Sequence, residues 1–362
     1  MNFRRFAGLA LAVLAAGSMT ACGGGSQAQK AEAPAGQASE DSGKGGSEGK
    51  GGAAAGEAQV ILTLAEVNPA DSLDGQVESY FKEQVESLSG GTVLIDIQAS
   101  GVMGAENDVL DGMTTNGGTV DMARISSFAL TNYGAKLSAL PSIPYTFNDR
   151  EHYWKYADSE IGQRILDEPS EMGLGIKGLF FVEEGFRNFF VKDEIDGIEG
   201  MKNKKIRVSS DPILTAVVEQ VGANPTVVSF SELYSSLQSG VVDGADQPIV
   251  TYESNAFNEV APYMLEDGHT MSASEVIITE AAWEKLSEEQ KAAIEEAGKA
   301  TSAYCKELSA RTEEECKARL EEKGVIFVAV PDKTPWQEAC SGVIAQYTQG
   351  LEEEYQQILD LK

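Results

Sequence analysis

The sequence predicts an α/β protein of two domains that are joined by a hinge and spanned by one long helix. Two separate stretches of its 362 residues alternate between strand-like and helix-like segments, a pattern typical of strands connected by helical crossovers. A third stretch keeps a helical pattern without proline over residues 286–324. A helix of that length exceeds one small domain, so we expect it to cross both domains.

The first alternating stretch runs from residue 59 to residue 185. Alternating and β-branched residues predict strands at 59–67, 92–100, 119–126 and 174–185. Helical spacing of apolar residues predicts helices at 71–91, 106–117 and 151–166. In the first helix, Val77, Phe81 and Val85 share one face. The order of these elements predicts a parallel sheet with helices packed on it.

The second alternating stretch begins after a loop and turn. Strands are expected at 205–209, 224–230 and 241–254, the last with a glycine turn. Helices are expected at 211–223 and 229–240. Gly222 and Gly240 end these helices, and Ser229 and Glu232 have capping-box spacing at the start of the second. A second α/β domain follows from this repetition of the first pattern.

The long C-terminal helix has clear start and stop signals. Ser287 and Gln290 form a capping box at its beginning, and Gly324 ends it. At the rise of an α-helix its length would be roughly 50 Å. The alternative is a coiled coil or a bent pair of helices. A short strand at 324–330 and a last helix are expected to complete the chain.

The charge of the chain is strongly acidic. It has 57 acidic and 28 basic residues, which gives a formal net charge of -29. This balance argues against a nucleic-acid partner, because binding phosphates needs a basic face. An anionic small molecule would be repelled by the protein as a whole and would need a dedicated local cation. Because salt screens charges beyond about 8 Å, one arginine can dominate its own pocket.

The N-terminal residues are predicted to be a targeting segment. Arg4 and Arg5 precede an apolar stretch that is too short to span a bilayer, and Cys22 follows small residues. This pattern predicts a lipoprotein signal peptide over residues 1–21 and a lipid on Cys22, with a plain secretory signal as the alternative. Residues 22–58 are predicted to form a disordered tether. The folded part would then lie extracytoplasmic, lipid-anchored to the outer face of the cell membrane or periplasmic.

The sequence contains no motif of the common enzyme classes considered. Nucleophile-elbow, phosphate-loop and zinc-protease motifs are all missing, so we expect no enzyme, with an unrecognised hydrolase as a remote alternative. Only two histidines occur, and the cysteines have no zinc spacing, so neither a metal nor a cofactor is expected. Cys305 and Cys316 would be about 16 Å apart on the long helix, too far to bridge. Cys340 could pair with either.

Arg207 is the best candidate for binding an anion. In its predicted strand Ile206 and Val208 share one face, so Arg207 takes the other. In open α/β sheets, ligands bind beyond the carboxyl ends of strands, where Arg207 lies. A guanidinium can hold a carboxylate through two hydrogen bonds, which lysine cannot do. The alternative is an exposed surface charge, as we expect for Lys204 and Lys205.

Three segments around Arg207 carry a family resemblance. They are GFRNFFVKDEIDGIEGMKNKKIRV, VGANPTVVSFSELYSSLQSGVVDGADQP and APYMLEDGHT. Together they resemble the extracytoplasmic solute receptors of tripartite ATP-independent periplasmic (TRAP) transporters, of the DctP type. The residues that match the family pattern are Arg187, Arg207, Gly222, Ala223, Pro225, Thr226, Phe230, Glu232, Tyr234, Leu237, Gln238, Gly240, Asp243, Gly244 and Pro248. A weaker resemblance extends from about residue 60 to residue 330.

This resemblance implies a fold and a site. The fold would be a two-domain periplasmic-binding-protein-like fold with a hinge and a domain-spanning helix. Arg207 would clamp the ligand carboxylate, and Arg187 would be a second donor or, alternatively, a structural ion-pair partner. Gln247 replaces the family's asparagine and is one methylene longer, which suggests a different or smaller substrate. The remaining expected contacts are Phe230, which could instead be a core residue, and Asn68, Ser126 and Ser210.

The resemblance also implies a function. The protein would be a monomeric receptor that captures a small organic acid and delivers it to the membrane subunits of a TRAP transporter. The expected domains are residues 59–184 plus 273–312 and residues 185–272 plus 313–362. A sensor or adaptor lipoprotein that presents its ligand to another receptor is the alternative.

Overall fold

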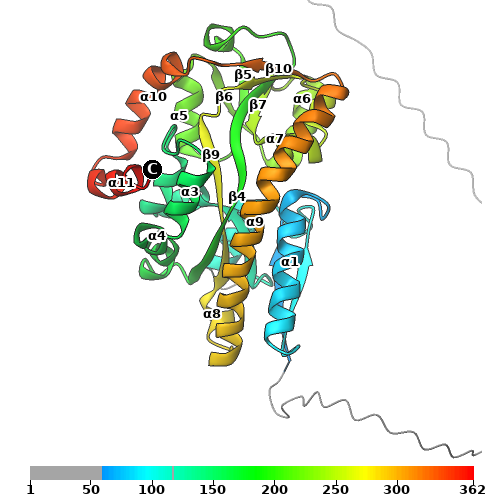
Figure 1. Ribbon diagram of the computed structural model, residues 1–362, viewed down its shortest axis with the longest axis vertical. Helices are drawn as coiled ribbons and strands as arrows, with labels where there is room; N and C mark the ends of the chain where they lie inside the picture. Colours follow the sequence, from blue (N-terminus) through cyan, green and yellow to red (C-terminus); the bar gives the residue numbers. More distant parts are fainter. Residues whose placement is uncertain (1–58, 116–117) are drawn as a thin grey trace, which may run out of the picture. The chain divides into compact units, whose positions relative to one another are not determined.

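One long strand connects the two halves of the fold. The computed structural model describes residues 59–115 and 118–362, and in it β4 (Ile176–Val191) belongs to both halves (Figure 1). Most of β4 pairs antiparallel with β9 (Thr270–Thr279), and its C-terminal end pairs antiparallel with β7 (Gly244–Gln247). The pairing with β9 shifts register between Glu183 and Phe186, so β4 is irregular where it passes from one half to the other.

The first half of the sheet is mixed, not purely parallel. Its order is β2 (Val93–Gln98), β1 (Val60–Ala65), β3 (Met122–Ser126), β9 and β4. The first three strands are parallel as predicted, but β9 is antiparallel to both β3 and β4. The strand β9 was missed. All ten of its residues are buried, and its apolar run at 276–278 lacks the alternation of a half-exposed strand.

The helices of this half match the predicted segments, with one exception. The predicted helices at 71–91 and 106–117 are α1 (Leu73–Leu88) and α2 (Glu106–Thr114). The predicted helix at 151–166 is two helices, α3 (Arg150–Ala157) and α4 (Glu160–Glu171). Ser159 lies between them and caps α4, with its hydroxyl accepting a hydrogen bond from the Gly162 N–H at 3.2 Å. A new N-cap there starts a second helix.

The second half contains β7, β5 (Lys205–Val208) and β6 (Asn224–Val227), with β5 parallel to both neighbours. Two further strands, β8 (Tyr263–Glu266) and β10 (Ile326–Ala329), pair beside β4. Helices α5 (Pro212–Gln220) and α6 (Leu233–Ser239) lie where predicted. Ser229 does not cap α6; its hydroxyl donates to the Glu232 carboxylate at 2.7 Å, and a 3-10 turn (Phe230–Glu232) comes first.

The predicted strand at 241–254 is mostly wrong. Only Gly244–Gln247 is extended, and after Pro248 the chain forms α7 (Ile249–Ser254). Pro248 has no N–H to donate to a ladder, and it is well suited to the start of a helix. The β-branched residues after it resemble a strand in sequence, but they are buried as one short helix.

The long helix is continuous. Helix α9 (Glu288–Glu322) has 35 residues, and the Ser287–Gln290 capping box is formed. It packs against α1, β4 and α7, so it contacts both halves of the fold (Figure 1). The bent-pair alternative is therefore wrong. The remaining elements are α8 (Glu280–Trp283), α10 (Thr334–Tyr347), α11 (Glu352–Leu359) and 3-10 helices at Ser127–Tyr133, Leu137–Ser142, Ile198–Met201 and Phe257–Glu259.

Several predictions concern parts of the chain that the structure does not describe. The signal peptide, Cys22 and the tether lie outside the described residues.

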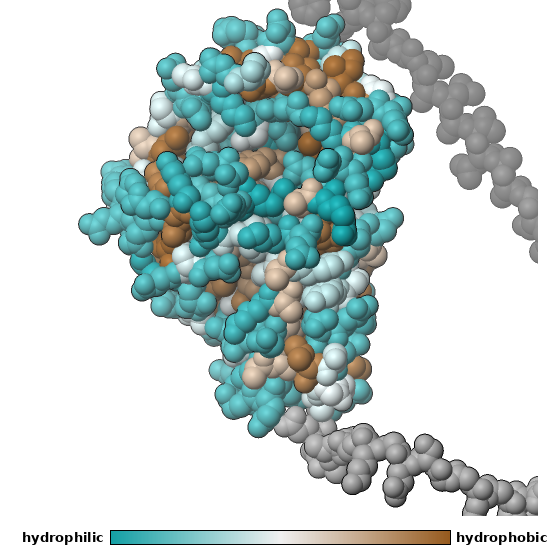
Figure 2. Space-filling model, in the orientation of Figure 1, coloured by the Kyte–Doolittle hydropathy of each residue, from teal (hydrophilic) through white to brown (hydrophobic). Residues whose placement is uncertain are grey.

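Cys305, Cys316 and Cys340 are buried free thiols. Across the described ranges, no helix is long and apolar enough to cross a membrane. The face seen in Figure 2 is mainly hydrophilic, in keeping with the excess of acidic residues.

Candidate functional site

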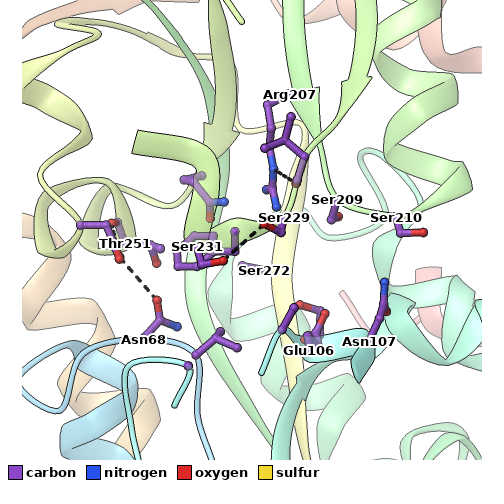
Figure 3. A pocket seen from close by; sticks show the side chains of 18 of the residues that line it. Asn68, Glu106, Asn107, Arg207, Ser209, Ser210, Ser229, Ser231, Thr251 and Ser272 are labelled. Atoms are coloured by element: carbon purple, nitrogen blue, oxygen red, sulfur yellow. Dashed lines mark hydrogen bonds between the residues drawn. The ribbon is translucent and has the colours of Figure 1, made fainter. Parts of the chain in front are cut away.

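A cavity of about 720 Å³ lies where the two halves of the sheet meet. Its walls come from the loop after β1, the start of α2, the end of β3, the middle of β4, the end of β5 and the end of β7. Such a volume is in the range of small-molecule sites. All seven residues predicted to bind ligand line it: Arg207, Arg187, Gln247, Phe230, Asn68, Ser126 and Ser210. Figure 3 shows three of them, Arg207, Asn68 and Ser210.

Arg207 is a buried cation whose guanidinium end is free. Ile206 and Val208 are fully buried in the core on the other face of β5, and Arg207 is 3 % exposed. Its Nε donates to the Val228 carbonyl at 2.8 Å, and its Nη atoms have no partner among the described residues. Burial lowers the pKa of Arg207 to about 10, so the side chain is still charged at neutral pH. The alternative of an exposed surface charge is therefore wrong.

The two neighbouring lysines do not reach the cavity. Lys205 is exposed and donates from Nζ to the Gly240 carbonyl at 2.9 Å. Neither Lys204 nor Lys205 lines the cavity. Lys205 is on the same face of β5 as Arg207, but it stands at the exposed first position of the strand, whereas Arg207 is buried.

Arg187, on β4, forms an ion pair with Asp246 but does not use all of its hydrogen-bond donors. Its Nε lies 2.5 Å from Asp246 Oδ2, and its Nη2 donates to the Asp246 carbonyl at 2.8 Å. Burial opposes ionisation of Asp246, but Arg187 and His269 hold the pKa of its carboxyl well below its usual value. Nη1 of Arg187 has no hydrogen bond within the described part of the chain. The ion-pair alternative thus describes the observed contact, and one donor remains beside the cavity.

Behind Arg187 a buried histidine links two aspartates. His269 Nδ1 lies 2.6 Å from Asp267 Oδ2, and its Nε2 lies 3.3 Å from Asp246 Oδ2. Phe189 stacks on the imidazole at 4.4 Å between ring centroids. Burial alone would lower the pKa of His269, but the two carboxylates raise it to about 9. The imidazolium therefore helps to hold Asp246, and through it Arg187, in place.

We expect this histidine to make stability depend on pH. Its pKa rises from 6.5 when unfolded to about 9 when folded, so its contribution is complete below pH 6.5 and is lost as the pH rises through 9. The contribution at low pH is on the order of 3 kcal/mol. Urea unfolding of the wild type and His269→Gln at pH 6, 7.5 and 9 checks this. The free-energy difference between the two proteins should shrink as the pH rises, and a constant difference would contradict a charged His269.

The other predicted residues occupy different positions on the cavity wall. Gln247 is 4 % exposed, and its side-chain amide has no hydrogen bond among the described residues. The Phe230 ring lies 5.9 Å from the Arg207 guanidinium carbon and edge-on to Phe257, so it is both a core residue and a lining residue. Asn68 is largely occupied, because its Nδ2 donates to Asp74 at 2.9 Å.

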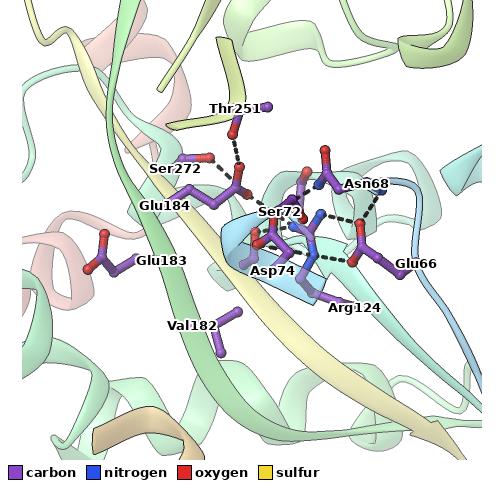
Figure 4. Close-up of polar contacts among 12 residues, drawn as sticks. Glu66, Asn68, Ser72, Asp74, Arg124, Val182, Glu183, Glu184, Thr251 and Ser272 are labelled. Atoms are coloured by element: carbon purple, nitrogen blue, oxygen red, sulfur yellow. Dashed lines mark hydrogen bonds and ion pairs between the residues drawn. The ribbon is translucent and has the colours of Figure 1, made fainter. Parts of the chain in front are cut away.

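The sequence interpretation missed a third arginine in the cavity. Arg124, on β3, makes two hydrogen bonds to Glu66, at 2.6 Å from Nε and 3.0 Å from Nη2 (Figure 4). Its Nη1 donates to Glu184 at 3.1 Å, and Asp74 lies 3.7 Å from Nε. Like Arg207, it stands in a short β-rich segment, DMARIS, between apolar neighbours. That shared pattern could have identified it.

The carboxylates around Arg124 were missed as well. Glu184, on β4, also accepts a hydrogen bond from Thr251 Oγ1 at 2.5 Å. Burial raises the pKa of Asp74 well above its usual value despite Arg124, which favours its protonated form. Arg124 is therefore a structural cation whose hydrogen-bonding groups are used by the protein itself. Arg207 is the arginine of the three that forms no salt bridge with the described residues.

In the part of the chain that the structure describes, no group of three or more histidine, cysteine, aspartate or glutamate side chains could hold a metal ion. The carboxylates of the cavity are engaged by Arg124, by backbone N–H groups or by hydroxyls.

Comparisons with known proteins show which family the chain is similar to. The family described as "Bacterial extracellular solute-binding protein, family 7" matches residues 64–350. A solute-binding protein of Roseobacter denitrificans is 33% identical over 250 residues, which cover 69% of this chain and 75% of that protein.

Two solved structures share the fold. A TRAP periplasmic solute binding protein from Pseudomonas putida with bound D-glucuronate is 26% identical with a TM-score of 0.79, covering 83% of this chain and 96% of the other. One from Sulfurospirillum deleyianum with bound succinate is 26% identical with a TM-score of 0.78, covering 84% and 100%. The two-domain α/β fold with its long helix is the fold of these proteins.

Proposed function

Because the chain belongs to family 7 of the bacterial extracellular solute-binding proteins, the family of TRAP solute receptors, we propose that it captures a small organic acid between its domains and delivers it to a membrane permease. The observation that carries this proposal is the buried guanidinium of Arg207, whose Nη atoms have no partner within the described residues. A buried charge without a partner is costly. A ligand carboxylate would supply the missing charge and accept two hydrogen bonds.

The neighbours of Arg207 would complete the contact. Arg187 has Nη1 to offer, while Asp246 holds the rest of its guanidinium in place. The Gln247 amide can donate and accept, and the Phe230 ring would pack against the ligand. Ser126 and Ser210 bring hydroxyls to the wall, whereas Asn68 offers mainly its Oδ1. All of these groups lie around one cavity, so one small ligand could reach several at once.

Capture would occur by closure of two domains, residues 59–184 plus 273–312 and residues 185–272 plus 313–362. The proposed boundary in β4 falls next to Gly185, which has φ +97° and lies within the register shift of the strand. Arg150 joins this point to α9, with salt bridges to Glu183 at 2.7 Å and to Glu313 at 2.6 Å. Hinges of this kind concentrate backbone change in a few residues.

We also propose how the receptor is located. Residues 1–21 would be removed as a lipoprotein signal peptide, Cys22 would carry the lipid, and residues 22–58 would tether a monomeric receptor at the outer face of the membrane. Its partners would be the membrane subunits of a TRAP transporter. The relatives are binding proteins of transport systems, which favours transport over the enzyme and sensor alternatives.

A thermal-shift screen tests the proposed function. We expect the melting temperature to rise with at least one small carboxylate from a panel of uronates, aldonates, dicarboxylates and keto acids. The matching alcohol or amide should have no effect, because it cannot neutralise Arg207. At a concentration 100 times the Kd, the ligand would add about 2.7 kcal/mol to the free energy of unfolding. A panel in which no acid raises the melting temperature would contradict the proposal.

A further inference from the structure

Two charged side chains stand on opposite walls of the cavity, Arg207 and Glu106 (Figure 3). Arg207 comes from β5 in the second half of the fold, whereas Glu106 is the first residue of α2 in the first half. Glu106 is half-buried, and its Oε1 accepts a hydrogen bond from the Ser126 N–H at 2.6 Å. Within the described residues no basic side chain forms a salt bridge with it. Burial raises the pKa of Glu106, and the Ser126 N–H and the charge of Arg124 oppose this rise. The cavity therefore has Arg207 on one wall and, on the other, a carboxyl group without a salt bridge.

The other charges of the cavity are compensated by the protein. Arg124 pairs with Glu66 and Glu184, and Arg187 pairs with Asp246. Asp108, also at the start of α2, lines the same wall as Glu106 and is exposed. A helix N-terminus normally favours an anion. Here two carboxylates of the chain already occupy that place, so a ligand anion gains nothing there.

These charges restrict what the far end of a ligand can be. With one carboxylate on Arg207, the rest of the molecule would extend toward Glu106, Asn107 and Ser126. Hydroxyl groups of the ligand could donate hydrogen bonds to Glu106. They could also donate to, or accept from, the Asn107 amide and the Ser126 hydroxyl. A second carboxylate would face like charges, which costs affinity and is a common basis of selectivity. An ammonium group is a poorer fit than a hydroxyl, because it has no lone pair to accept a hydrogen bond from the Asn107 side-chain amide on the same wall.

We propose that Glu106 is a specificity-determining residue that makes this site select hydroxylated monocarboxylates over dicarboxylates. The inference rests on the proposed capture of a carboxylate by Arg207. Arg207 alone would bind any small carboxylate. Glu106, on the opposite wall, would accept hydrogen bonds from the ligand's hydroxyl groups and repel a second anionic group.

Gluconate and glucarate provide a matched test. The two acids have the same carbon chain and the same inner hydroxyl groups, but glucarate has a second carboxylate in place of the terminal alcohol. Titration calorimetry of the full protein should give a Kd for gluconate at least about tenfold lower than for glucarate. In Glu106→Gln the preference should fall to within about threefold, because the amide no longer repels the second carboxylate.

The control is Asp111→Asn, which removes one negative charge from the same helix at a residue that does not line the cavity. It should keep the wild-type preference. Equal or tighter binding of glucarate or succinate by the wild type would overturn the inference but leave the Arg207 clamp standing. An unchanged preference in Glu106→Gln, or tighter binding of 6-aminohexanoate than of gluconate, would also overturn it. If no acid binds at all, the proposed function fails with it.

Discussion

Replacing Arg207 by methionine is expected to abolish the rise in melting temperature that carboxylates give the wild-type protein. Methionine keeps most of the side-chain volume but cannot donate a hydrogen bond. Each hydrogen bond to the ligand carboxylate contributes about 1.5–3 kcal/mol, so losing two would weaken binding by roughly a hundredfold or more. In Arg207→Lys the rise in melting temperature should lie between that of the wild type and that of Arg207→Met. Lysine keeps the positive charge but lacks the two parallel N–H donors of the guanidinium.

The matched controls are Lys204→Ala and Lys205→Ala. Each removes one positive charge close to Arg207 in the chain, at a residue that does not line the cavity. Ligand-induced stabilisation, measured by thermal shift and titration calorimetry, should be nearly intact in both. If the lysine variants lose binding as badly as Arg207→Met, the assignment of Arg207 as the carboxylate clamp is wrong. Ligand binding would then depend on the total positive charge of this segment and not on one arginine.

Replacing Arg124 by methionine is expected to destabilise the fold itself. The variant leaves Glu66 and Glu184 buried without their counter-charge (Figure 4). Breaking a buried ion pair from one side typically costs about 3–5 kcal/mol. Burial raises the pKa of Glu66, but Arg124 holds it below its usual value. The cost should therefore be largest at neutral pH and smaller at acid pH, where Glu66 of the variant can take up a proton. Urea unfolding at pH 7 and pH 5 measures both effects.

Arg319→Met is the control for this second prediction. Arg319 also forms a close salt bridge, at 2.6 Å to Glu253, but its side chain is 48% exposed. An exposed pair is worth about 0–1 kcal/mol, so the loss should be small. A loss below about 1 kcal/mol in Arg124→Met as well would mean that the buried carboxylates need no counter-charge. In that case the distinction between a structural arginine and a binding arginine would fail.

Much of the fold could be predicted from local sequence patterns. Alternation in β1 and β5, helical spacing in α1, and the capping box and glycine stop of α9 are all local signals, and each element formed where its signal stood. The wrong predictions concern segments in which tertiary contacts override the local secondary-structure preference. The strand β9 is buried along its whole length, and its apolar run at 276–278 shows no alternation. Helix α7 carries β-branched residues, but it follows Pro248 and is packed as a helix.

The candidate site could be predicted only in part. The motif around Arg207 led to seven residues that do line one cavity. Whether each side chain in the cavity is free or already paired depends on contacts between distant parts of the chain. Arg187 is held by Asp246, 59 positions away, and Arg124 by Glu66, 58 positions away. A single sequence does not reveal which arginine will find a carboxylate partner inside the protein. It therefore could not separate the open guanidinium of Arg207 from the satisfied one of Arg124.

The most direct test of the Arg207 clamp is a crystal structure with the acid that raises the melting temperature most. We expect a carboxylate in the cavity with its two oxygens about 2.7–2.9 Å from the Nη1 and Nη2 atoms of Arg207. Arg124 should keep its pairing with Glu66 and Glu184 unchanged. A ligand whose carboxylate lies against Arg124, or that binds outside the cavity while Arg207 stays without an anionic partner, would contradict the account.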